Sequence, residues 1–253
     1  MWNNTRRAWT RRRRAGALSA PVLFVLVGLS TIVPCASAAV EDPLEPINRP
    51  IFAVNNAFDR FALRPVAKGY DFVMPDPAQR SVSNFFANLY DVTSALNAVL
   101  QWRWDGALRN SGRVLVNSTI GVVGLFDVAS SMGMSVYRTD FGQTLSIWGV
   151  PEGPYMMLPL FGPRTMRSGA GTLVDTFTLS VPPQLSNRSL RNTLWATELV
   201  HGRARLLGTD ELITGDRYIF VRDAYLQQRS ILVNDGKVVD EFSDFEEPWE
   251  DEF

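Results

Sequence analysis

The chain has 253 residues, 46% of them hydrophobic, with 25 basic and 26 acidic side chains. It contains one cysteine and one histidine, so the mature chain has no structural disulfide. A metal site of the His/Cys type, which needs three or four ligands, is excluded in practice. Without its arginine-rich N-terminus the chain is clearly acidic, which argues against binding of nucleic acid.

Residues 1–38 have the pattern of a secretory signal peptide. Arginines precede an apolar stretch over residues 15–33, and Ala36 and Ala38 follow with the spacing of a cleavage site. Cys35 lies where a bacterial lipoprotein carries its acylated cysteine, although Pro34 replaces the small residue expected before it. Two alternatives stay open: lipid attachment at Cys35, or cleavage after Ala38 that removes this cysteine.

The body of the chain, residues 39–236, predicts a succession of helices. The first regular helix is expected to begin near Pro50, because apolar residues then recur at intervals of three and four. A longer helix is expected from Asp76, an N-cap candidate followed by proline, and apolar residues continue with helical period to Leu100. A further helix over 107–116 is expected to turn Arg109 and Arg113 away from the apolar side.

Trp102 and Trp104 flank an arginine at the end of the long predicted helix. Tryptophans at this position are typical of a membrane interface, although buried core tryptophans give the same pattern. Tyr155 and Phe161 lie in a proline-bounded, unusually apolar segment, 151–163, that is expected to be an extended loop. Because loops are normally polar and exposed, this one is expected to lie against an apolar surface or a membrane interface.

The longest apolar run after the N-terminus is 116–129. It is too short to cross a bilayer, which takes roughly 20 apolar residues. Gly121 and Gly124 are three residues apart, which would place both on one helical face and allow another backbone to approach. The run is therefore expected either to be buried in a helical core or to enter a membrane partway.

Four more helices are expected: a short one that starts with Thr139 or Asp140 as its cap and ends at Trp148, and longer ones over 164–179, 189–207 and 216–232. Ser189 is the candidate N-cap of the helix over 189–207. Because few stretches alternate with a period of two, the fold is expected to be almost all α. The acidic end, 237–253, is expected to be a disordered, solvated tail, with docking on a partner as the alternative.

The catalytic motifs that a sequence can reveal are missing here. The chain has no G-x-S-x-G elbow, phosphate-binding loop or dinucleotide-binding fingerprint. A lone helical histidine such as His201 is most often structural. The spacing of Asp127, Asp140, Glu152 and Asp175 does not favour a two-carboxylate site. The sequence therefore favours binding or transport over an enzyme, and implies no cofactor.

Several short motifs, in order, resemble the MlaA/VacJ family of outer-membrane phospholipid-transport lipoproteins. The resemblance extends over about residues 42–230. The motifs are Asp42-Pro43-Leu44-Glu45-x-x-Asn48-Arg49, Arg64-Pro65-Val66-Ala67, Ser83-Asn84-Phe85, Asn88-Leu89, Asn117-Ser118-Thr119-Ile120-Gly121, Gly124-Leu125-Phe126-Asp127-Val128-Ala129, Asp140-Phe141-Gly142-Gln143-Thr144-Leu145, Trp148-Gly149-Val150, Gly153-Pro154-Tyr155, Leu158-Pro159 and Arg222-Asp223-Ala224-Tyr225.

This resemblance implies an all-α, ring-like domain in the inner leaflet of the outer membrane, with a central amphipathic pore. It implies removal of misplaced phospholipids from the outer leaflet and their transfer to a periplasmic lipid-carrier protein. It also implies association with a trimeric porin. Two other functions stay open: a porin-associated scaffold that transports nothing, and a hydrolase acting on envelope lipid or glycan.

The residues expected to line such a pore come from the first helix and from the 116–129 run. The alternative is that their polar side chains cap or bond to backbone and that their glycines allow close packing. The expected lining residues are Asn55, Asn56, Asn117, Ser118, Thr119, Gly121 and Gly124.

Overall fold

The computed structural model describes residues 42–234, which are mostly helical with one short two-stranded sheet. The expectation of an almost all-α fold is confirmed. The predicted signal peptide, Cys35 and the predicted acidic tail lie outside the described residues, and the domain boundaries at 38 and 236 stay predictions. None of the described helices is long and apolar enough to cross a membrane.

The N-terminal arm is one continuous helical path. It consists of α1 (Glu45–Phe58), a π-helical turn η1 (Asp59–Leu63) and α2 (Arg64–Val73). The predicted start near Pro50 is wrong, because the helix already begins at Glu45 with Pro46 in its first turn, where a missing N–H costs little. Pro50 lies inside α1.

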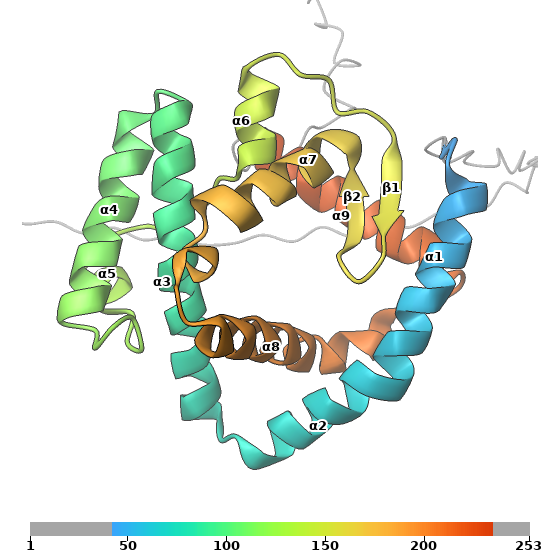
Figure 1. The fold of residues 1–253 in the computed structure, drawn as a ribbon, viewed down its shortest axis with the longest axis horizontal. Coiled ribbons are helices and arrows are strands. Elements are labelled where there is room, and N and C mark those ends of the chain that lie inside the picture. Colours follow the sequence, from blue (N-terminus) through green and yellow to red (C-terminus); the bar gives the residue numbers. More distant parts are fainter. Residues whose placement is uncertain (1–41, 235–253) are drawn as a thin grey trace, which may run out of the picture. The chain divides into compact units, whose positions relative to one another are not determined.

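The long helix predicted from Asp76 is confirmed as α3 (Asp76–Leu100), but its N-cap is Pro75, so the predicted capping role of Asp76 is wrong. The next helix, α4 (Trp104–Thr119), extends three residues beyond its predicted range at each end and lies beside α3 (Figure 1). The short helix α5 (Val128–Ser131) packs on α4.

Arg113 corrects the predicted orientation of α4, since its side chain is only 2% exposed. Its Nε donates to Asp91 on α3 at 2.9 Å, and its Nη2 lies 3.2 Å from Asp127 before α5. Its Nη1 donates to the Met134 carbonyl at 2.8 Å and to the Ser130 hydroxyl at 3.0 Å. One guanidinium therefore joins three helices and the segment that follows them.

The apolar run does not continue as a helix beyond Thr119. A turn follows in which Val122, Val123 and Gly124 all have left-handed backbone, with φ of 54°, 58° and 85°. The expectation that Gly121 and Gly124 share a helical face is wrong. A Cβ at Gly121 would lie 2.2 Å from the Phe126 carbonyl oxygen, so this glycine lets the chain fold back on itself.

The 151–163 segment was expected to be an extended loop, but much of it belongs to a hairpin. Strand β1 (Tyr155–Leu158) pairs antiparallel with β2 (Gly162–Thr165), and Tyr155 lies opposite Thr165. Before the hairpin comes α6 (Phe141–Ile147), with Asp140 as N-cap as predicted. After it come α7 (Met166–Val174), the π-helical η2 (Asp175–Leu179) and the 3₁₀ turn η3 (Pro182–Gln184).

The last third of the described chain contains α8 (Arg188–Ala204), the 3₁₀ turn η4 (Leu207–Leu212) and α9 (Arg217–Val233). The N-cap of α8 is Asn187, so the predicted cap Ser189 is wrong. Asp216 caps α9, close to its predicted start.

Contacts between the elements of this unit form a closed circuit. The arm α1–η1–α2 contacts α8, α8 contacts α3, and α3 contacts α6. The circuit continues through α7 and the hairpin, and β1 returns to α1 (Figure 1). We call this circuit the ring, and α4 lies against the side of α3 that faces away from it.

Replacement of Arg113 tests how strongly buried polar contacts stabilise this fold. Arg113→Leu leaves Asp91, itself buried, without its cation, and should lower the free energy of unfolding by about 3–5 kcal/mol. Urea denaturation of the detergent-solubilised protein, followed by far-UV circular dichroism, measures this change. Arg109→Leu is the matched control, since the pair with Asp105 is exposed and should cost less than about 1 kcal/mol. Equal, small effects would contradict this account.

Candidate functional site

Large apolar side chains are exposed on nearly every element of the ring. Trp102 is 77% exposed, Trp104 is 54% exposed, and their rings meet edge to face with centroids 6.0 Å apart. Phe72 at the end of α2 is 92% exposed. Other strongly exposed examples are Val54, Phe61, Val73, Leu108, Leu115, Ile120, Val123 and Phe177. This amount of large apolar surface is unfavourable in water and suits an apolar surrounding medium.

The four residues expected at a membrane interface differ in their positions. Trp102, Trp104 and Phe161 are exposed. Tyr155 is only 4% exposed and packs with Met157 and Tyr218 in the hydrophobic core. The prediction that Tyr155 lies at a membrane interface is therefore wrong. Alternate residues of β1 are buried, and the Tyr155 side chain packs in the core with residues of α1 and α9.

Asn48 of the N-terminal motif holds the hairpin against α1. Its Nδ2 donates to the Tyr155 carbonyl at 3.2 Å, and its Oδ1 accepts from the Met157 amide at 2.8 Å. The same Nδ2 donates to Asp42 at 3.1 Å, and the Tyr218 hydroxyl of α9 also donates to Asp42. The edge of strand β1 is thus held by one buried side-chain amide that lies 107 residues away in sequence from Tyr155.

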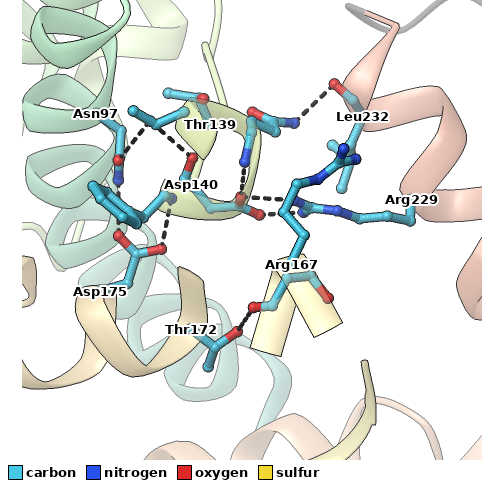
Figure 2. A network of polar contacts seen from close by, with 12 residues as sticks. Asn97, Thr139, Asp140, Arg167, Thr172, Asp175, Arg229 and Leu232 are labelled. Atoms are coloured by element: carbon cyan, nitrogen blue, oxygen red, sulfur yellow. Dashed lines mark hydrogen bonds and ion pairs between the residues drawn. The ribbon is translucent and has the colours of Figure 1, made fainter. Parts of the chain in front are cut away.

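A second polar network closes the ring where α6 meets α3, η2 and α9 (Figure 2). Asp140 caps α6 through the Gln143 amide at 2.8 Å and pairs with Arg229 of α9. Asp175 accepts from the Phe141 amide at 2.9 Å and from Asn97 of α3 at 2.8 Å. Burial raises the pKa of Asp175, opposed by these two hydrogen bonds.

The carboxylates considered for catalysis are all engaged in such contacts. Asp127 accepts from Arg113, Asn117 and Ser130. Glu152 lies 3.8 Å from Arg167, whose Nη1 also donates to the Val150 carbonyl. Each of these acids therefore has a structural role.

Polar side chains from several ring elements gather around Tyr90 of α3. Its hydroxyl donates to Glu198 of α8, although the tyrosine side chain is largely exposed. Arg138, which precedes α6, and Arg164 of β2 are close enough to affect its charge state. Desolvation of the hydroxyl by the surrounding elements raises the Tyr90 pKa, as does the Glu198 charge, whereas the two arginines lower it. Because these groups come from α3, α8, β2 and the segment before α6, which lie on different sides of the circuit (Figure 1), we infer that they face the inner side of the ring.

The structure shows the contacts of the residues expected to line a pore. Asn55 donates to the Leu158 carbonyl and accepts from the Leu160 amide, both at 2.9 Å, and so holds the hairpin turn. Asn56 beside it is half-buried. Their role in a pore stays a prediction.

The expected residues of the apolar run lie together at the end of α4. Asn117 is buried and binds Asp127 and the Ala129 amide. The Ser118 hydroxyl accepts from Asn88 of α3 at 3.0 Å, and Thr119 donates to the Leu115 carbonyl at 2.6 Å. These bonds match the alternative in which polar groups bond locally and glycines allow close packing. A pore-lining role for this group also stays a prediction.

Sequence reasoning did not identify Tyr90, Glu198 or Arg113 as key residues. Tyr90 and Glu198 are 108 residues apart, and neither belongs to a motif. Arg113 has a weak local signal, since it lies among Leu108, Val114 and Leu115 in a helix with few other charges. A charge in that setting is a candidate for a buried ion pair.

These features define a class of protein: a ring of helices with many exposed large apolar side chains and buried polar contacts where its elements meet. A model of the MlaA lipoprotein family matches residues 40–231. The chain therefore belongs to the MlaA lipoprotein family.

Individual relatives agree with this assignment. The intermembrane phospholipid transport system lipoprotein MlaA of Escherichia coli (strain K12) is 34% identical over 225 residues, covering 84% of this chain and 88% of the relative. The protein of the same name in Haemophilus influenzae is 32% identical, covering 79% of this chain and 82% of the relative. A solved structure described as "Structural basis for maintenance of bacterial outer membrane lipid asymmetry" is similar with a TM-score of 0.67 and 35% identity, covering 77% of this chain and all of that one.

Gly124 tests the role of the turn after α4. An added Cβ would lie 2.8 Å from two Asn88 side-chain atoms, and φ is 85°. Gly133→Ala is the matched control, because φ is 83° there and open space surrounds the glycine. The control should lose about 1 kcal/mol of unfolding free energy from backbone strain, and Gly124→Ala about 1–3 kcal/mol more. Thermal denaturation in detergent compares them, and equal losses would show that the contact with Asn88 contributes nothing.

Proposed function

We propose that this protein acts in intermembrane phospholipid transport, removing misplaced phospholipids from the outer leaflet of the outer membrane and so maintaining lipid asymmetry. The observation that carries the proposal is the match to named transport lipoproteins over more than four fifths of the chain. The exposed apolar side chains of the ring support it independently.

The distribution of side chains suits passage of a lipid headgroup. An ionised phosphate in hydrocarbon is strongly unfavourable, because it loses its hydration without gaining polar partners. Arg138 and Arg164 would supply such partners on the inner side of the ring. The acyl chains would stay in the surrounding lipid while the headgroup crosses. The transfer needs no bond to be broken, so we infer transport without catalysis.

The location and partners follow from the same proposal. The exposed tryptophans and aliphatic side chains would lie in the inner leaflet of the outer membrane, at its periplasmic face. Acylation of Cys35 would add an anchor, although the apolar surface itself provides membrane affinity. The relatives' names describe a transport system, which supports a periplasmic lipid-carrier protein as the acceptor. We propose a trimeric outer-membrane porin as the partner within the membrane.

The test is the amount of phospholipid on the cell surface in a deletion strain. Surface phospholipid, measured by an outer-leaflet-specific label or by phospholipase accessibility, should rise on deletion and fall again when the intact gene is restored. A gene with Arg138→Glu should lower surface phospholipid only in part, because a carboxylate beside Glu198 and Tyr90 repels a phosphate.

Arg188→Glu is the matched control, since this arginine is exposed in the first turn of α8. This variant should lower surface phospholipid in the deletion strain as fully as the intact gene does. Unchanged surface phospholipid in the deletion strain, with the protein expressed in the parent, would contradict the proposal and favour the scaffold function.

A further inference from the structure

A pocket of about 270 Å³ opens where the first two turns of α3 meet the end of α8. Small-molecule sites commonly have volumes of about 300–1,000 Å³, so this pocket has room for a lipid headgroup but not for its acyl chains. Its lining residues are Asp76, Gln79, Arg80, Ser83, His201 and Arg205.

Two guanidinium groups from different helices contribute to this pocket. Arg80 belongs to α3 and Arg205 follows α8; both are exposed, and within residues 42–234 neither guanidinium group has a hydrogen-bond or ion-pair partner. Arg203, two residues before Arg205, differs sharply: it is buried and binds both Asp59 and Asp210. Unpaired guanidinium groups that converge on one pocket favour an anion, above all a phosphate with several acceptor oxygens.

The buried His201 orients a hydroxyl toward the same pocket. Its Nδ1 lies 3.0 Å from the Tyr70 hydroxyl and its Nε2 lies 2.7 Å from the Ser83 hydroxyl. Burial lowers the His201 pKa, and the Arg205 charge lowers it further, so the ring is neutral and carries one N–H. In the tautomer in which Tyr70 donates to Nδ1, Nε2 donates to Ser83 and leaves the serine proton for a ligand oxygen.

Asp76 gives the pocket one negative group. Its carboxylate is exposed at the start of α3, and it is the only acid among the lining residues. A purely anionic ligand would be repelled by it. A ligand that joins a phosphate to a primary amine would satisfy both the arginines and this carboxylate.

We propose that this pocket binds the zwitterionic headgroup of an aminophospholipid, a phosphodiester that carries a primary amine. Arg80, Arg205 and Ser83 hold the phosphate, and Asp76 accepts from the ammonium group. The inference rests on the proposed function and narrows it, because it names a lipid class and the residues that recognise its headgroup.

Binding of water-soluble headgroups tests the inference on the purified full-length protein. Isothermal titration calorimetry at low ionic strength would use sn-glycero-3-phosphoethanolamine, sn-glycerol 3-phosphate and inorganic phosphate. The wild type should bind the phosphoethanolamine compound most tightly. The double variant Arg80→Gln, Arg205→Gln should bind it about tenfold more weakly or worse, since each lost contact is a hydrogen bond to a charged group.

The variant Asp76→Asn distinguishes recognition of the ligand's amine from recognition of its phosphate. It should weaken binding of glycerophosphoethanolamine and strengthen binding of glycerol 3-phosphate, because the carboxylate attracts the amine of one and repels the charge of the other. Inorganic phosphate bound as tightly as glycerophosphoethanolamine, with no effect of Asp76→Asn on either, would overturn the headgroup assignment in favour of a free-phosphate site.

The matched control is the double variant Arg188→Gln, Arg191→Gln at the other end of α8. It removes the same charge outside the pocket and should leave binding unchanged. An equal loss in both double variants, or no binding to the wild type, would overturn the inference. Neither result depends on the cell-surface assay, so failure of this pocket is distinguishable from failure of the transport proposal.

Discussion

The ion pair between Arg113 and Asp91, 2.9 Å from nitrogen to oxygen and almost completely buried, joins α3 to α4 and, through Asp127, to α5. The buried hydrophobic cluster of the described unit is small, centred on Tyr155, Met157 and Tyr218. A ring of helices buries little apolar surface in a common core, because most of the contacts lie between neighbours along the circuit. Buried polar contacts at the joints therefore supply the specificity of packing that a core supplies in a compact domain.

Because buried polar contacts hold the elements together, many apolar side chains are left on the surface. Apolar side chains that a compact protein would bury, such as Phe72 and Trp102, remain exposed on the ring. In a membrane this exposure is favourable, and under the proposed function the polar side chains around Tyr90 would occupy the side that lipid tails do not cover. The same division of apolar and polar surface that stabilises the protein in a bilayer would let a headgroup pass.

Local signals in the sequence predicted part of this fold. Asp140 and Asp216 cap their helices, and the helix starting at Asp76 follows its predicted course, because capping and helical periodicity depend on neighbouring residues. The hairpin was not predicted, since its β1 strand is held by Asn48, far away in sequence. The exposed Trp102 and Trp104 agree with their expected surface position, whereas Tyr90 and Glu198 meet only through the tertiary fold.

The central claim is that the exterior of the ring faces lipid and its inner side is polar and hydrated. Site-directed spin labelling in a reconstituted bilayer tests it most directly, with one nitroxide at Leu115 or at Tyr90 in a variant lacking Cys35. The account predicts that the label at Leu115 is relaxed by oxygen, which concentrates in hydrocarbon, and the label at Tyr90 by a water-soluble nickel complex. Equal access of the nickel complex to both labels would contradict it.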